Sequence, residues 1–203
     1  MMSSCRRDLS GLASALVRST AILALVNGRL IVSQPPEALP DFLRADRQTI
    51  RLALSRFPQL PPSVTKELNR RGCTVPQVWG ATKPGNVIRG SFLHAGQIDW
   101  AILCSVNRIS SILIFGNSSS DQVVAIGREA DVNKLQRVGG DKVGYSRAIS
   151  PVGRGFIMQH YQLYGGVKPP PIDHLGIEDA FVEKASIVHY FYRGKWMELT
   201  GAD

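Results

Sequence analysis

Three apolar runs, separated by two short polar breaks, lie between residues 86 and 115. The runs are rich in β-branched and aromatic residues and occupy 87–92, 100–104 and 112–115. The breaks occupy 94–97 and 105–110 and hold turn-forming residues such as Gly96 and Asn107. This spacing predicts an antiparallel meander of three strands.

Helical periodicity precedes the meander. Four apolar residues predict one buried face of a helix over 41–57: Leu43, Ile50, Leu54 and Phe57. Ser63 is in position to cap a second helix that ends before Gly72. After a proline-rich joint at 34–36, we therefore expect a helical pair within 34–72.

Segments with strand periodicity and segments with helical periodicity alternate in the C-terminal half. Strands are predicted at 122–126 and 143–149, and a hairpin of 187–192 and 195–199 around Arg193 and Gly194. Helices are predicted at 131–138, from a Ser150 cap to Tyr164, and at 173–185. The expected fold of 73–203 is α+β: an antiparallel sheet of five to seven strands with helices packed mainly on one face. Together with the helical pair it should form one globular unit.

Composition supports a folded core, because 44% of the 203 residues are hydrophobic. No apolar run reaches the ~18 residues of a membrane span. Residues 1–33 hold four arginines and a single acidic residue, Asp8, around an apolar core, as an export leader does. Arg6-Arg7 resembles the start of a twin-arginine signal. We expect cleavage near Ser33 and an extracytoplasmic protein, the alternative being an amphipathic helix.

Cysteine usage agrees with export. Cleavage would remove Cys5 and leave Cys73 and Cys104. In an oxidising compartment these two are expected to form a disulfide. The alternative is a pair of buried free thiols.

One part of the meander resembles a known repeat. Gly90, Phe92, Gly96, Asp99 and Ala101 fall on the core positions of an FG-GAP or VCBS-type repeat, so that 86–103 resembles one blade of such β-propellers. That family often holds calcium in the loop, but here the acidic positions are filled by Ser91, Leu93 and His94. From Gly72 to Asp203 the chain resembles exported bacterial proteins without an assigned activity, which implies a location and no chemistry.

The segment 173–179 carries the most suggestive chemistry. On a helix, His174 and Glu178 would lie one turn apart with Asp173 at the helix start, a set that suits a divalent metal. The alternative makes Asp173 an N-cap and Glu178 a partner of the helix dipole. His160, His174 and Glu178 are also the candidates for catalysis. Ser146 lies outside a nucleophile elbow, although the sequence permits its pairing with His160 or His189.

Five arginines form a candidate polyanion contact: Arg44, Arg47, Arg51, Arg70 and Arg71. The net charge of +8 permits such binding. Asp41 and Asp46 interleave with the first three, however, so a solvated helix face is the favoured interpretation, and nucleic acid is not an expected partner.

Three function classes follow. The favoured hypothesis is an exported, non-catalytic protein that binds an unidentified protein or small molecule, or associates with the envelope. A metal-dependent or other hydrolase using residues 173–179 is the second, and a polyanion or nucleic-acid binder the third. No cofactor is expected, because Gly153-Arg154-Gly155 lacks the strand and spacing of a phosphate-binding loop.

Overall fold

The computed structural model describes residues 25–26, 29–30 and 40–202. The chain divides into two compact units, residues 1–37 and 38–203. Of the first unit, the strands β1 (Leu25–Val26) and β2 (Arg29–Leu30) are described, and they pair antiparallel. The rest of the expected leader, its cleavage near Ser33 and the joint at 34–36 lie outside the described residues.

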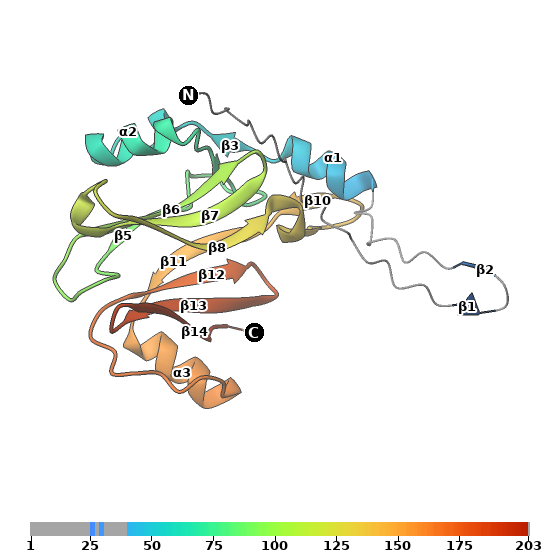
Figure 1. The fold of residues 1–203 in the computed structure, drawn as a ribbon. Coiled ribbons are helices and arrows are strands. Elements are labelled where there is room, and N and C mark those ends of the chain that lie inside the picture. The colour runs from blue at the N-terminus through green and yellow to red at the C-terminus, as the bar shows by residue number, and fades with distance from the viewer. Residues whose placement is uncertain (1–24, 27–28, 31–39, 203) are drawn as a thin grey trace, which may run out of the picture. The chain divides into compact units, whose positions relative to one another are not determined.

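The second unit is built around two four-stranded antiparallel sheets (Figure 1). The first sheet is a meander of β5 (Val87–Gly90), β6 (Asp99–Val106), β7 (Ile109–Phe115) and β8 (Val123–Ala130). The second is a meander of β11 (Arg147–Val152), β12 (Gly176–Phe181), β13 (Ala185–Tyr192) and β14 (Lys195–Thr200). The predicted three-strand meander, the fourth strand and the C-terminal hairpin are thus confirmed.

Strands β6 and β7 are buried on both faces. Ile102 and Leu113 point to one core, whereas Leu103 and Ile112 point to the other. Successive residues of a strand face opposite sides, so a strand between two cores is apolar at every position. This explains why the sequence shows continuous runs here instead of alternation.

The N-terminal part of the unit covers the outer face of the first sheet with its second helix, while its first helix packs against the core between the two sheets. It contains α1 (Pro40–Gln48), β3 (Arg51–Leu52), the 3-10 turn η1 (Leu54–Arg56), α2 (Pro62–Arg70) and β4 (Val75–Pro76). Val64 and Leu68 of α2 pack with Trp100 and Phe115 of the sheet. Strands β3 and β4 pair antiparallel, while Ala45 of α1 joins the core between the two sheets.

Helix α3 (Arg154–Tyr164) covers the outer face of the second sheet, where Ile157 packs with Val188, Tyr190 and Leu199. The remaining elements connect the layers: η2 (Gly116–Ser118), η3 (Asp131–Lys134), β9 (Leu135–Arg137) and β10 (Val143–Tyr145). The order of layers is therefore helix, sheet, sheet, helix. No helix in the described part of the chain is long and apolar enough to cross a membrane.

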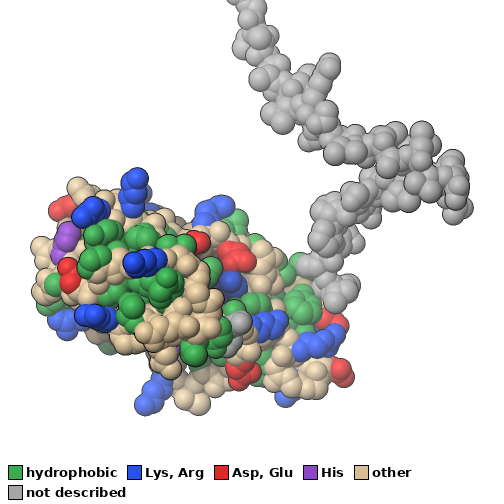
Figure 2. Space-filling model, turned by 90° about the horizontal axis from the view of Figure 1, so that it is seen from below, with side chains coloured by type: hydrophobic (Ala, Val, Ile, Leu, Met, Phe, Trp, Pro, Cys, Tyr) green, Lys and Arg blue, Asp and Glu red, His purple; other side chains and the backbone are tan. Residues whose placement is uncertain are grey.

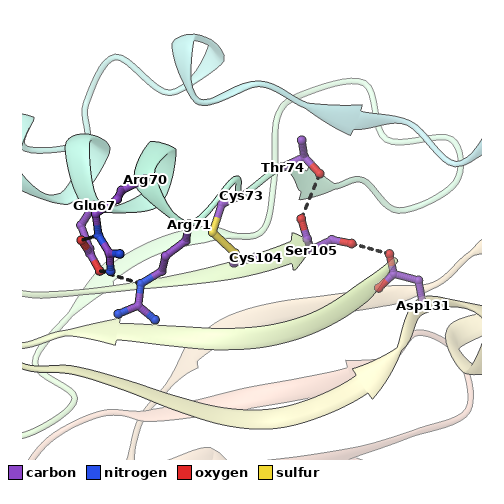
Figure 3. The surroundings of a disulfide bond; sticks show 8 residues. All are labelled: Glu67, Arg70, Arg71, Cys73, Thr74, Cys104, Ser105 and Asp131. Atoms are coloured by element: carbon purple, nitrogen blue, oxygen red, sulfur yellow. Dashed lines mark hydrogen bonds and ion pairs between the residues drawn. A yellow bond between two sulfur atoms is a disulfide. The ribbon is translucent and has the colours of Figure 1, made fainter. Parts of the chain in front are cut away.

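Cys73 and Cys104 form a disulfide, which confirms that prediction (Figure 3). Their Cα atoms are 5.2 Å apart. Cys73 follows α2 and Cys104 lies in β6, so the bond joins the helical layer to the first sheet. Thr74 adds to this junction through its backbone N–H, which donates to the carbonyl of Ser105.

The mixed α and β content is confirmed, but the expected single sheet of five to seven strands is wrong. Between β8 and β11 the chain forms η3 and the β9–β10 pair, so the strands divide into two meanders that pack face to face. The helices consequently cover two outer faces, one for each sheet. Periodicity identified the strands but does not encode which strand pairs with which.

The helix predicted over 41–57 ends at Gln48. Leu43 and Ile50 are exposed, whereas Leu54 and Phe57 are buried. Arg51 folds back so that its guanidinium donates to the carbonyl and carboxylate of Asp46, and the chain then pairs in β3. The four apolar residues thus belong to different elements. Helix α2 ends as expected, but the Ser63 hydroxyl donates to the carbonyl of Ser118 instead of capping it.

Three further helix predictions need correction. The helix expected at 131–138 is the short turn η3 followed by β9. Helix α3 ends at Tyr164 as predicted but begins after Gly153, because Ser150 and Pro151 belong to β11. The helix expected at 173–185 is strand β12, which hydrogen-bonds to β11 on one side and β13 on the other. Pairing on both edges outweighs the weak local helical preference of this segment.

Candidate functional site

The helix on which the proposed metal site depended is absent from 173–185. Asp173 and His174 stay close, with Oδ1 and Nε2 3.8 Å apart and both side chains against Tyr190, but Glu178 has other partners. Glu178 accepts hydrogen bonds from the hydroxyls of Ser150 and Ser186, at 2.7 and 2.8 Å. Asp173 accepts from the Tyr190 hydroxyl. His174 places its ring nitrogens 3.0 and 2.9 Å from the carbonyls of Leu175 and Phe191. The described residues hold no group of three or more His, Cys, Asp or Glu side chains arranged for a metal.

The other two catalytic candidates, His160 and Ser146, lie in different segments, and each side chain is directed to a nearby backbone carbonyl. His160 lies on α3, its Nδ1 2.9 Å from the carbonyl of Phe156 in the preceding turn. Ser146 is buried between β10 and β11, with its hydroxyl directed to the carbonyl of Gly144. Both make local contacts of a kind that stabilises the fold.

A charged cluster that the sequence did not reveal lies between the sheets. Arg147 donates to Asp179 through Nε at 2.8 Å and Nη2 at 2.6 Å. His189 Nε2 lies 3.6 Å from Asp179 Oδ2. These residues come from adjacent strands β11, β12 and β13 and line a cavity of about 500 Å³. We call Arg147, Asp179 and His189 the Arg147 cluster.

Edge strand β8 closes the Arg147 cluster. The register of β7 and β8 shifts near Gly127, which has a φ of +58° and accepts a hydrogen bond from Arg147 Nη2 through its carbonyl. A Cβ at this position would lie 2.8 Å from Arg147 Nη2 and 3.2 Å from Asp179 Oδ2. Glycine is therefore favoured at this position for two reasons: it adopts the positive φ readily, and it leaves room for the Arg147 and Asp179 side chains.

Electrostatics within the Arg147 cluster favour ionisation. Burial opposes the charge on Asp179, but His189 and the Arg147 guanidinium outweigh burial and lower the pKa of Asp179 to about 2. The same pairing outweighs burial in raising the pKa of Arg147. Arg147 Nη1 and His189 Nε2 are buried without a hydrogen-bond partner among the described residues.

The Arg147 cluster offers an acid–base pair but not a complete catalytic set. Ser186 is the hydroxyl residue that lines its cavity. The Ser186 hydroxyl donates to Glu178 and accepts from the backbone N–H of Ala202, so it is engaged on both sides. A nucleophile needs a base within hydrogen-bond reach, and the observed bonds direct Ser186 elsewhere.

Most of the arginines proposed for polyanion contact are paired with carboxylates. Arg44 bonds to Asp41, and both Arg70 and Arg71 bond to Glu67 (Figure 3). The hydrogen bonds from Arg70 and Arg71 outweigh desolvation and lower the pKa of Glu67 to about 2. Arg51 bonds to Asp46 and Asp131. Arg47 is exposed on α1.

A second cavity is built on the loop 78–85. Gln77 is buried at the base of this loop; its side-chain oxygen accepts from the N–H of Gly85 at 2.8 Å, and its nitrogen donates to the carbonyl of Val75 at 3.0 Å. Gly80 has a φ of +73°, and the N–H of Ala81 donates to the carbonyl of Val78 to close a turn. The loop is thus held at both ends by its own hydrogen bonds.

Trp79 forms one wall of this cavity, which we call the Trp79 pocket. Its backbone N–H donates to the carbonyl of Tyr145 at 2.7 Å, and its side chain lies against Gly144, where an added Cβ would approach to 2.5 Å. Trp79 as a whole residue is 51% exposed. A half-exposed tryptophan fixed at the mouth of a cavity offers a flat apolar surface to a ligand.

The Trp79 pocket has a volume of about 450 Å³, within the range typical of small-molecule sites. Its walls are mainly apolar, with Ile50, Leu52, Val78 and Val143 beside Trp79. Two cations, Arg56 and Lys83, lie on its lining, which contains no acidic residue. No described carboxylate lies within 4.0 Å of either cation.

Tyr145 also lines the Trp79 pocket, but it is 2% exposed and its side chain belongs to the core between the sheets. Burial together with the nearby Asp131 carboxylate raises the pKa of its phenol. The phenol therefore stays neutral at physiological pH. Lys142 adds a third cation nearby, its Nζ 6.0 Å from the centre of the Trp79 ring. The pocket combines an apolar body with positive charge at its rim.

Sequence reasoning missed the Trp79 pocket because its walls come from segments far apart in the chain. The available sequence signal was Trp79 shortly before a run of turn-forming residues at 82–86, Thr-Lys-Pro-Gly-Asn. That pattern indicates a loop and says nothing of what the loop faces. No family model, curated protein or solved structure matches the chain.

Proposed function

We propose that this protein is an extracytoplasmic binding protein whose Trp79 pocket takes a small amphipathic anion. The observation that carries the proposal is the composition of the pocket: an apolar cavity of about 450 Å³ with Arg56 and Lys83 on its lining and no acidic residue. An aromatic or aliphatic body would pack against Trp79, and a carboxylate, sulfonate or phosphate would lie by the cations.

The extracytoplasmic location rests on two observations. The Cys73–Cys104 disulfide is of a kind that persists in oxidising compartments and is rare in reducing ones. Residues 1–33 have the charge and hydropathy pattern of an export leader. Together they support a protein that acts outside the cytoplasm.

Binding without catalysis is the better supported class. The walls of the Trp79 pocket carry no histidine, cysteine or carboxylate that would serve as base or nucleophile. The Arg147 cluster holds titratable groups, but its one lining hydroxyl is engaged by Glu178 and Ala202. We therefore assign that cluster to the stability of the inter-sheet layer.

A matched pair of fluorescent probes tests the proposal. Anilinonaphthalene sulfonate and the uncharged N-phenyl-1-naphthylamine share an aromatic body and differ in the anionic group. We expect the full chain to bind both, and Trp79→Ala to weaken both. The double variant Arg56→Gln/Lys83→Gln should weaken the sulfonate alone by about tenfold, because each of the two exposed ion pairs contributes up to about 1 kcal/mol and a loss of about 1.4 kcal/mol is tenfold.

The control is Lys184→Gln/Lys195→Gln, which removes two exposed lysines outside the pocket lining. It should leave both affinities unchanged. Equal losses of sulfonate binding in the two double variants would show a general charge effect and contradict the proposal. Unchanged binding of both probes to Trp79→Ala would place their site elsewhere.

A further inference from the structure

Helix α3 and the segment after it form a continuous stretch without acidic residues. Residues 153–172 contain Arg154, His160 and Lys168 but no Asp or Glu. This stretch supplies the outer layer on the second sheet, remote in sequence from the Trp79 pocket. Its charge is therefore wholly positive.

The body of α3 exposes polar residues, Arg154, Gln159 and Gln162, as a surface helix usually does, but its C-terminal end exposes apolar ones. Ile157 faces the core and is fully buried, yet Leu163 is 64% exposed and Tyr164 49%. Val167, just beyond the helix, is 54% exposed. Figure 2 views this side and shows hydrophobic side chains gathered with Lys and Arg side chains among them.

Aromatic rings line the helix in a row. The His160 ring lies 4.0 Å from the Phe156 ring and 6.0 Å from the Tyr164 ring, centroid to centroid. Aromatic rings with a polar edge are enriched where proteins meet the interface between water and lipid. Of the three rings, Tyr164 at the end of the helix is of this kind, whereas Phe156 packs against the core around Ile157.

The two cations converge although they are distant in sequence. Arg154 opens α3 and Lys168 follows its end, yet both line one cavity of about 390 Å³ with Met158 and Pro169–Pro171. The proline-stiffened segment therefore runs back along the helix. A cavity with two cations and no acid on its lining suits an anionic headgroup, and apolar side chains lie beside it.

We propose that α3 and residues 165–172 dock on an anionic membrane surface. Leu163, Tyr164 and Val167 enter the interfacial region of the bilayer, and Arg154 and Lys168 contact lipid phosphates. Charge complementarity favours this occupant, because residues 153–172 offer exposed apolar residues together with two cations, and the first acidic residue is the exposed Asp173 just beyond the segment. The inference is independent of the Trp79 pocket and stands if that pocket binds nothing.

Vesicle co-sedimentation of the full chain tests this docking. Vesicles of phosphatidylcholine mixed equally with phosphatidylglycerol should bind the protein, and vesicles of phosphatidylcholine alone should bind it several-fold less. Leu163→Ser/Tyr164→Ser should abolish binding, and Arg154→Gln/Lys168→Gln should remove the preference for the anionic lipid. Both pairs are exposed, so we expect native urea-unfolding curves.

The matched control is Ile187→Ser, which removes an apolar residue that is 45% exposed on β13, together with Lys195→Gln. This variant should bind vesicles as the parent does. Equal binding to both vesicle types would overturn the proposal. So would absence of vesicle binding. If the protein is then a dimer that Leu163→Ser/Tyr164→Ser converts to a monomer, a second copy covers α3.

Discussion

At the scale of single residues, the buried charges of this protein are arranged in networks. Asp131 has no exposed side-chain surface and accepts from Arg51 at 2.7 Å, from the Ser105 hydroxyl at 2.6 Å and from the Ser110 hydroxyl. Figure 3 shows its bond with Ser105. Asp179 is held by Arg147 in the same way. Removing one member of a buried pair leaves an uncompensated charge, which is costly. These residues stabilise the contacts between layers.

Acid should weaken the fold through Asp179. Its pKa is about 2 in the folded protein against an ordinary value of 3.8. A lowered folded-state pKa stabilises the protein above the unfolded value, and this contribution is lost as pH falls from about 4 to 2. The loss amounts to about 2 kcal/mol. Urea unfolding at pH 4 and pH 2 should show that Asp179→Asn loses less stability over this interval than the parent; equal losses would contradict the role assigned to Asp179.

Replacing Gly127 should destabilise the protein more than replacing a glycine that has a similar positive φ but no close neighbours. Gly127→Ala strains a φ of +58° and also drives a Cβ against Arg147 and Asp179. Gly140→Ala strains a φ of +53° with no atom within 4 Å of the new Cβ. Backbone strain costs about 1–2 kcal/mol in either case. Urea unfolding should show Gly127→Ala less stable by at least ~1 kcal/mol, and equal costs would disprove the close approach.

At the scale of elements, the sequence predicted strands better than helices. The meander of β5–β8 and the hairpin of β13 and β14 were predictable, because apolar runs and turns such as Arg193-Gly194 are local signals. The helix expected at 173–185 failed because β12 is stabilised by two neighbouring strands that are distant in sequence. Likewise, Leu43 and Ile50 fit a helical face by spacing alone and are exposed.

The candidate sites were less predictable than the fold. Asp179 and His189 were visible as residues, but their approach depends on the pairing of β12 with β13, which periodicity does not encode. The Trp79 pocket requires α1, β3 and β10 to meet one loop. The disulfide was predictable because only Cys73 and Cys104 remain once the leader is set aside.

Breaking the Cys73–Cys104 bond should destabilise the protein. The bond joins residues 31 positions apart, and closing such a loop in the unfolded chain is worth about 3 to 4 kcal/mol in the chain-entropy model. Urea unfolding with and without reductant measures the difference, and Cys73→Ala/Cys104→Ala should be insensitive to reductant. The unreduced, denatured full chain should expose one thiol, that of Cys5. Three titratable thiols would exclude the bond.

At the scale of the whole molecule, the layers leave two distinct surfaces. The Trp79 pocket is built by the N-terminal segment, loop 78–85 and β10, whereas α3 forms the outermost layer on the second sheet. The first is concave and suits a small anion, and the second is an apolar and basic face that suits a lipid surface. If both proposals hold, the protein would bind its ligand while held at a membrane.

The most direct test of the binding account uses the indole N–H resonances of the three tryptophans. Trp79 is half exposed in the pocket, whereas Trp100 is 7% exposed in the core beneath α2 and Trp196 packs against Phe191. Titration with anilinonaphthalene sulfonate, with assignment by Trp79→Phe, should shift the Trp79 resonance saturably and leave that of Trp100 unchanged. A Trp79 resonance that stays fixed while the probe binds would contradict the account.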